Sequence, residues 1–134
     1  MKLIRKSMPI FLAKKKGIII NIASIGGIAG SRAGAAYTTS KYALIGLTKN
    51  VGFQYATSGI RCNAIAPGGV NTNIGKTINA PDKFGMERAT SGAANNVRMG
   101  ESSEIATVAL FLACDDSSLV NGTVITADAG WTAY

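Results

Sequence analysis

Two short apolar runs, separated by a helical segment, constrain the fold of this chain more than any other feature. Residues 18–23 read Ile-Ile-Ile-Asn-Ile-Ala, and residues 60–66 form a second such run just after the helix breaker Ser58-Gly59. Nearly continuous apolar runs of this length are typical of strands whose two faces are both covered by helices. Residues 35–55 carry apolar side chains at helical spacing and are predicted to join the two strands. The order strand, helix, strand predicts a parallel α/β sheet with a right-handed crossover.

The remaining segments extend this pattern toward both ends. Residues 1–16 are predicted as an amphipathic helix with a kink at Pro9 and an end at Gly17. Residues 101–115 are predicted as a helix with acidic side chains in its first turn, where the helix dipole favours them. Residues 123–127 are predicted as the last strand.

Residues 73–97 are rich in Gly, Asn, Ser and Thr, contain Pro81 and show only weak periodicity. We predict a long loop here. A loop of this length inside a compact domain is usually functional or disordered.

Composition limits the classes of function. A length of 134 residues supports one domain. The formal net charge is +7, but the positive side chains gather within residues 2–16, which indicates a solvated helix face rather than a nucleic-acid partner. No apolar stretch is long enough for a secretory core or a membrane span, so we expect no membrane partner.

The chain contains no histidine, and its two cysteines, Cys62 and Cys114, fit no metal-ligand spacing. We therefore predict no metal site. Buried, reduced thiols are the default for cysteines in a cytoplasmic protein, and a cytoplasmic location is expected.

Ser24, Tyr37 and Lys41 are three reactive side chains around the predicted crossover. Tyr37 and Lys41 are four residues apart, which places them on one helix face with Cβ atoms roughly 5–6 Å apart. Ser24 directly follows the first strand, at the carboxyl end where open α/β sheets bind ligands. The sequence therefore predicts that the three side chains share one small volume.

This trio suits redox chemistry between a carbonyl group and an alcohol. A tyrosine has a pKa of about 10, so proton transfer near neutral pH requires a downward shift of roughly 2–3 units at about 1.4 kcal/mol each. One cation about 4 Å away stabilises the phenolate by about 4 kcal/mol at an effective dielectric of about 20, so Lys41 nearly suffices. Ser24 would donate a hydrogen bond to a carbonyl oxygen that gains negative charge during reduction.

A proline-glycine turn, Pro67-Gly68-Gly69-Val70-Asn71-Thr72, follows the second strand and permits close backbone approach to a ligand. Three features are found together with it: the run Ile-Ile-Asn-Ile-Ala-Ser that ends at Ser24, the thirteen-residue spacing from Ser24 to Tyr37, and the motif Tyr-x-x-x-Lys. With these features the chain resembles the short-chain dehydrogenases/reductases. Its tail is similar to that of the 3-oxoacyl-carrier-protein reductase and glucose dehydrogenase type.

The resemblance implies a Rossmann-like, doubly wound parallel sheet. It also implies an NAD(P)-dependent oxidoreductase that interconverts a ketone and a secondary alcohol, with a 3-oxoacyl group as one candidate substrate. Ser24, Tyr37 and Lys41 would be catalytic, and Tyr37 and Lys41 would also contact the cofactor, either NAD or NADP. Further cofactor contacts are implied for Pro67, Gly68, Val70 and Thr72.

By the same resemblance, residues 73–97 or thereabouts would be a lid that covers the substrate. Ser24, Ile74 and Phe84 would then contact the small carbonyl or alcohol substrate. Family members commonly associate, so a homo-oligomer, a dimer or a tetramer, is expected, with Trp131 and Tyr134 as packing or subunit-contact residues.

Members of this family carry three further elements ahead of the region that matches. These are a Thr-Gly-x-x-x-Gly-x-Gly loop for the pyrophosphate, an Asn-Asn-Ala-Gly segment and a helix asparagine, none of which is found here. We therefore expect residues 1–134 to form a single partial domain, the catalytic and substrate-binding C-terminal half, with the first strands and the glycine-rich loop missing. Either this fragment is the catalytic portion of an oxidoreductase, or it is a non-catalytic remnant that acts as an oligomerisation or interaction module.

Overall fold

The central strand of the fold is β2 (Ile60–Pro67), which is almost completely buried. Ile60, Cys62 and Ile65 in this strand are at most 1% exposed. In the computed structural model, which describes residues 1–133, β1 (Gly17–Ile22) pairs with one side of β2 and β3 (Val124–Ala127) with the other, both in parallel. A strand with neighbours on both sides and helices over both faces is buried on both faces, which explains its mostly apolar sequence.

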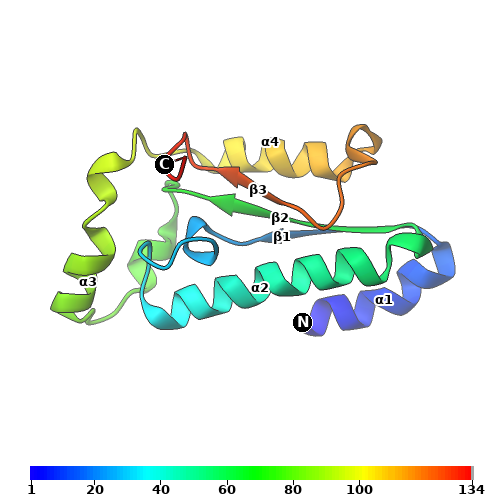
Figure 1. The fold of residues 1–134 in the computed structure, drawn as a ribbon, viewed down its shortest axis with the longest axis horizontal. Coiled ribbons are helices and arrows are strands. Elements are labelled where there is room, and N and C mark those ends of the chain that lie inside the picture. The colour runs from blue at the N-terminus through cyan, green and yellow to red at the C-terminus, as the bar shows by residue number, and fades with distance from the viewer. Residues whose placement is uncertain (134) are drawn as a thin grey trace.

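Helices cover the sheet on both faces, as Figure 1 shows. α1 (Lys2–Lys14) and α2 (Ala35–Gln54) lie along one face, and α4 (Ser102–Ala113) lies along the other. α2 is the crossover that connects β1 to β2. The predicted parallel α/β architecture is therefore confirmed.

The predicted end of the first helix at Gly17 is wrong. α1 ends at Lys14, and Lys15 takes the left-handed conformation, with φ at 49°, while its N–H donates to the Leu12 carbonyl. Gly17 instead begins β1, where a Cβ would lie 2.5 Å from Cγ of Phe11. Glycine is thus needed here for close packing of the strand beneath the helix rather than for the turn.

The apolar core between the sheet and the two helices has two parts. One consists of Met8, Val51, Ile60 and Cys62, and the other of Ala23, Ile45 and Ala64. The second part lies at the end of β1, so the residues that follow β1 pack against buried apolar side chains. Burial raises the pKa of the Cys62 thiol to about 11, so this group is a neutral thiol.

Residues 73–97 are not a structureless loop, contrary to prediction. They contain two 3-10 turns, Asn73–Thr77 and Ala93–Asn95, and the helix α3 (Lys83–Thr90). The helix begins where the Asp82 side chain accepts a hydrogen bond of 2.6 Å from the Gly85 N–H, a cap that the weak periodicity concealed. Figure 1 shows α3 beyond the end of the sheet to which the strand arrows point.

Within residues 1–133, no helix combines the length and the apolar character that a membrane crossing requires. The same residues contain no cluster of three or more Cys, Asp or Glu side chains suited to a metal ion. Tyr134, predicted as a packing or subunit-contact residue, lies outside this described part of the chain.

Candidate active site

Ser24 lies just beyond the carboxyl end of β1, where it caps the 3-10 turn Ile25–Gly27. Its Oγ accepts a hydrogen bond of 3.0 Å from the Gly26 N–H. A serine hydroxyl has one donor and two acceptor positions, so the cap leaves the Ser24 hydrogen available to another acceptor. The local geometry therefore holds Oγ in place without using its donor.

Two glycines let the Ser24 turn lie directly against α2. A Cβ at Gly27 would lie 2.9 Å from the backbone carbonyl of Lys41, and one at Gly26 would lie 3.4 Å from Cε1 of Tyr37. At Gly27 only glycine permits this distance without displacing the backbone of the helix. Gly27 is thus the residue that lets the turn beginning at Ser24 pack against α2, which carries Tyr37.

Tyr37 and Lys41 occupy the first turns of α2 on one face, as their spacing predicts. The Lys41 Nζ lies 5.4 Å from the centroid of the Tyr37 ring. It also donates a hydrogen bond of 3.0 Å to the backbone carbonyl of Ile22, the last residue of β1. An ammonium group has three donors, so Lys41 retains donor capacity beside the Tyr37 ring.

A cavity of about 430 Å³ brings these side chains together with the proline-glycine turn. It opens at the carboxyl ends of β1 and β2, the expected position for a ligand site in an open α/β sheet. All but one of the residues predicted from the sequence as site residues line it: Ser24, Tyr37, Lys41, Pro67, Gly68, Val70, Thr72 and Ile74.

Phe84, the remaining predicted substrate contact, does not line this cavity. It lies on α3 and is 75% exposed. The structure thus brings together the predicted residues on the core elements and the nearby Ile74, and leaves Phe84 outside.

Met99 and Ser102, which the sequence does not predict as site residues, also line the cavity. They reach it because residues 69–71 pair with Gly100: the Gly100 N–H donates to the Gly69 carbonyl, and the Asn71 N–H donates to the Gly100 carbonyl, at 2.8 and 2.9 Å. No local sequence pattern predicts this pairing, because it joins positions about thirty residues apart.

The same pairing orients the backbone of Val70. The Gly69 carbonyl and the Asn71 N–H are hydrogen-bonded to Gly100. The N–H and carbonyl of Val70, which lies between them, therefore point to the opposite side of this extended segment. A backbone donor and acceptor that face away from the pairing partner are suited to an amide-bearing ligand.

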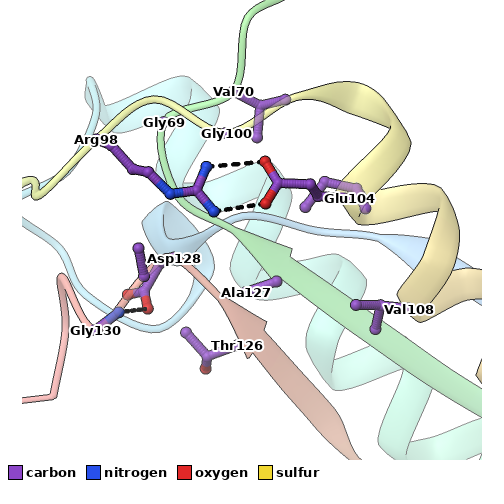
Figure 2. Close-up of a pocket in the computed structure, with 12 residues that line it drawn as sticks. Gly69, Val70, Arg98, Gly100, Glu104, Val108, Thr126, Ala127, Asp128 and Gly130 are labelled. Carbon is purple, nitrogen blue, oxygen red and sulfur yellow. Dashed lines mark hydrogen bonds and ion pairs between the residues drawn. The ribbon is translucent and has the colours of Figure 1, made fainter.

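A second cavity of about 360 Å³ lies on the other side of the proline-glycine turn (Figure 2). Arg98 forms a two-pronged ion pair with Glu104 there, and this contact lowers the pKa of Glu104 to about 2. The carboxylate of Asp128 accepts hydrogen bonds from the Gly130 N–H and from Thr132. The charged groups of this cavity are therefore engaged within the protein, Arg98 and Glu104 with each other and Asp128 with the turn after β3.

The parallel sheet, with helices on both faces and a ligand cavity at its carboxyl end, places the chain among Rossmann-like α/β proteins. Residues 1–132 match the family described as enoyl-(acyl carrier protein) reductase. The chain therefore belongs to the short-chain dehydrogenase/reductase family.

Its relatives include dehydrogenases and reductases of several kinds. The chain is 49% identical over 131 residues to 3beta-hydroxysteroid dehydrogenase 2 of Eggerthella lenta, covering 97% of this chain and 50% of that protein. It superimposes on 4-hydroxyisoleucine dehydrogenase complexed with NADH and succinate with a TM-score of 0.81 and 30% identity, covering 98% and 53% of the two chains. For 3-oxoacyl-[acyl-carrier protein] reductase from Brucella melitensis the TM-score is 0.78 at 28% identity, with 96% and 47% covered. The chain thus spans about half the length of the relatives it matches.

Proposed function

We propose that the protein containing this chain is an NAD(P)-dependent oxidoreductase that interconverts a ketone and a secondary alcohol. One observation carries the proposal: Ser24, Tyr37 and Lys41 line a single cavity at the carboxyl end of the sheet. Membership of a family of dehydrogenases and reductases supports the same conclusion. Residues 1–134 would form its catalytic and substrate-binding half.

In the reducing direction, Ser24 donates a hydrogen bond to the substrate oxygen. Its Oγ is fixed by the Gly26 N–H, so the hydroxyl needs no reorganisation as negative charge grows on that oxygen. Tyr37 donates the proton to the oxygen, and the Lys41 ammonium favours the phenolate that remains. In the oxidising direction the same groups act in reverse.

The cavity also fits a nicotinamide cofactor, which supplies or accepts the hydride when bound. Lys41 retains donors for ribose hydroxyls, and Tyr37 lies on the same helix face. The backbone of Val70 faces away from Gly100 and would bind the carboxamide. The Thr72 hydroxyl accepts from the Ile74 N–H and keeps its own hydrogen for a ligand. Pro67 and Gly68 form the wall between these groups.

Residues 73–97 would cover the bound substrate. Ile74 lines the cavity and would contact the substrate directly, whereas Phe84 would do so only after α3 moves inward. A small carbonyl or alcohol compound, including a 3-oxoacyl group, is the proposed substrate class.

The test is carbonyl-dependent oxidation of NADH and NADPH by the protein at its full encoded length. A panel of cyclic ketones, steroid ketones and 3-oxoacyl esters should contain at least one substrate for one of the two cofactors. Failure of every ketone, together with failure of the matching alcohols with NAD⁺ and NADP⁺, would reject the proposal.

A second candidate function, association with other chains, is favoured by the edge of the sheet. Within the described residues β1 has only β2 as a neighbour, and its Ile22 is 47% exposed. Unpaired apolar edges promote pairing with another chain. Light scattering on residues 1–134 combined with calorimetric titration of NADH separates the two functions: stable oligomers without dinucleotide binding would favour an interaction module.

A further inference from the structure

Three segments that are distant in the sequence meet at one backbone carbonyl, that of Gly92. Trp131 donates to it from Nε1 at 2.9 Å, and Arg32 donates to it from Nη1 at 3.4 Å. Arg32 belongs to the loop between Ser24 and Tyr37, Gly92 to the end of segment 73–97, and Trp131 to the turn after β3. One acceptor thus joins the serine loop, the proposed lid and the C-terminal turn.

The two donors also contact each other. The guanidinium carbon of Arg32 lies 4.9 Å from the centroid of the Trp131 ring, within the range of a cation–π interaction. Both side chains are partly buried. Each member of the trio therefore touches the other two, so removal of one member removes two of the three contacts and leaves the third unsupported.

Glycine at position 92 is required by this arrangement. A Cβ there would overlap Nη1 of Arg32. Gly75, at the other end of the same segment, has no atom within 4 Å of its corresponding Cβ position. Of these two glycines, only Gly92 lies in close contact with another side chain.

The turn that presents Trp131 is fixed by Asp128. One carboxylate oxygen accepts from the Gly130 N–H at 3.0 Å, and the other accepts from the Thr132 N–H at 2.8 Å and from its hydroxyl at 2.6 Å. Figure 2 shows the Asp128 contact to Gly130. The turn also packs on the proline-glycine turn, because a Cβ at Gly68 would lie 2.7 Å from Cβ of Asp128.

We propose that Arg32, Gly92 and Trp131 form a clasp that sets the position of segment 73–97 over the cavity. Residues 73–88 of this segment are exposed throughout, so the segment has little packing of its own. Neither Arg32 nor Trp131 lines the cavity of Ser24, Tyr37 and Lys41, so both are positioning residues that hold the cover in place. The effect on catalysis rests on the function proposed above, whereas the clasp itself is a physical property of the chain.

Trp131 is the one tryptophan among residues 1–134, and each variant differs from the unsubstituted protein at one position, so a difference in tryptophan fluorescence between them reports on the clasp. In the protein at its full encoded length, Arg32→Ala and Gly92→Ala should each shift the Trp131 emission to the red and increase its quenching by acrylamide. Trypsin should also cleave faster after Lys83 and Arg88, the basic residues of α3. Gly75→Ala is the matched control and should leave the emission, the quenching and the cleavage unchanged.

The catalytic readout is the division between KM and kcat. Loss of one hydrogen bond changes an equilibrium constant by about three- to tenfold. Arg32→Ala should therefore weaken the position of the segment that covers the substrate and raise KM by about that factor, with little change in kcat. Arg32→Lys, which keeps a cation over the Trp131 ring, should recover part of the loss. A uniform fall in kcat with unchanged KM would instead indicate a structural role and overturn the positioning role.

The two proposals fail separately. Absence of turnover in the unsubstituted protein would reject the proposed function and would leave the fluorescence and cleavage measurements to decide the clasp. Unchanged Trp131 quenching and unchanged cleavage in both Arg32→Ala and Gly92→Ala would reject the clasp, whatever the activity.

Discussion

The side chain of Lys41 joins α2 to the end of β1 through a hydrogen bond of 3.0 Å from Nζ to the carbonyl of Ile22. This contact keeps the ammonium group beside the Tyr37 ring, with its centroid 5.4 Å away, rather than extended into solvent. One lysine thus has two roles, a structural tie between strand and helix and a fixed positive charge at the cavity.

Replacement of Lys41 by methionine should remove both roles while the length of the side chain is kept. Turnover should fall by roughly 10²-fold or more, because the phenolate of Tyr37 loses the cation beside its ring. The matched control is Lys49→Met, an exposed lysine on the same helix, which should leave turnover unchanged. Steady-state kinetics of the two variants measures the difference, and equal activities would contradict the proposed role of Lys41.

Gly27→Ala tests whether the Ser24 turn must lie against α2. The new Cβ would lie 2.9 Å from the Lys41 carbonyl, and a backbone group cannot move aside as the end of a side chain can. We expect destabilisation by about 1–3 kcal/mol, the usual range for overpacking. Gly30→Ala, with nothing within 4 Å of the added Cβ, should have a much smaller effect. Denaturant unfolding measures the stability of both variants, and equal midpoints would show that the close approach of Gly27 to α2 does not contribute to stability.

The ion pair between Arg98 and Glu104 predicts a dependence of stability on pH. Arg98 and, to a lesser extent, the Glu101 N–H lower the pKa of Glu104 from 4.5 to about 2, so the folded state holds this carboxylate charged where the unfolded chain would bind a proton. The contribution of the pair is therefore complete above about pH 4.5 and is lost as pH falls toward about 2. Glu104→Gln should flatten this part of the stability curve. Glu87→Gln, an exposed acid on α3, should reproduce the unsubstituted curve.

Cys62 should be unreactive in the folded protein. Its side chain is 0% exposed, so a reagent cannot reach it. Burial also raises its pKa to about 11, so the reactive thiolate does not form near neutral pH. In a Cys114→Ser background, a thiol reagent should label Cys62 only after denaturant is added. Rapid labelling under native conditions would show that the core around β2 opens.

The order of the elements could be predicted because its signals are local. Apolar runs mark β1 and β2, helical spacing marks α2, and Ser58-Gly59 before Ile60 and the proline after Ala66 mark the ends of the central strand. Ser24, Tyr37 and Lys41 were found for the same reason, since their spacing along one strand and one helix determines their proximity.

Other features depend on contacts that no short stretch of sequence contains. The αL conformation of Lys15 and the packing of Gly17 under Phe11 involve neighbouring elements, so the end of the first helix was misplaced. Met99 reaches the cavity through pairing across about thirty residues, and Arg32 meets Gly92 across sixty. Such contacts become visible only when the chain is folded.

The central claim is that Tyr37 transfers the proton, and the most direct measurement is the turnover number of Tyr37→Phe in the protein at its full encoded length. The change removes a single oxygen, so the thermal midpoint should stay close to that of the unsubstituted protein. Turnover should fall by roughly 10²–10⁴-fold, the range for loss of a general acid or base. Tyr42→Phe is the matched control, because Tyr42 lies on the same helix, is 44% exposed and does not line the cavity. Full turnover in Tyr37→Phe would contradict the account, whereas a large loss confined to Tyr37→Phe would confirm it.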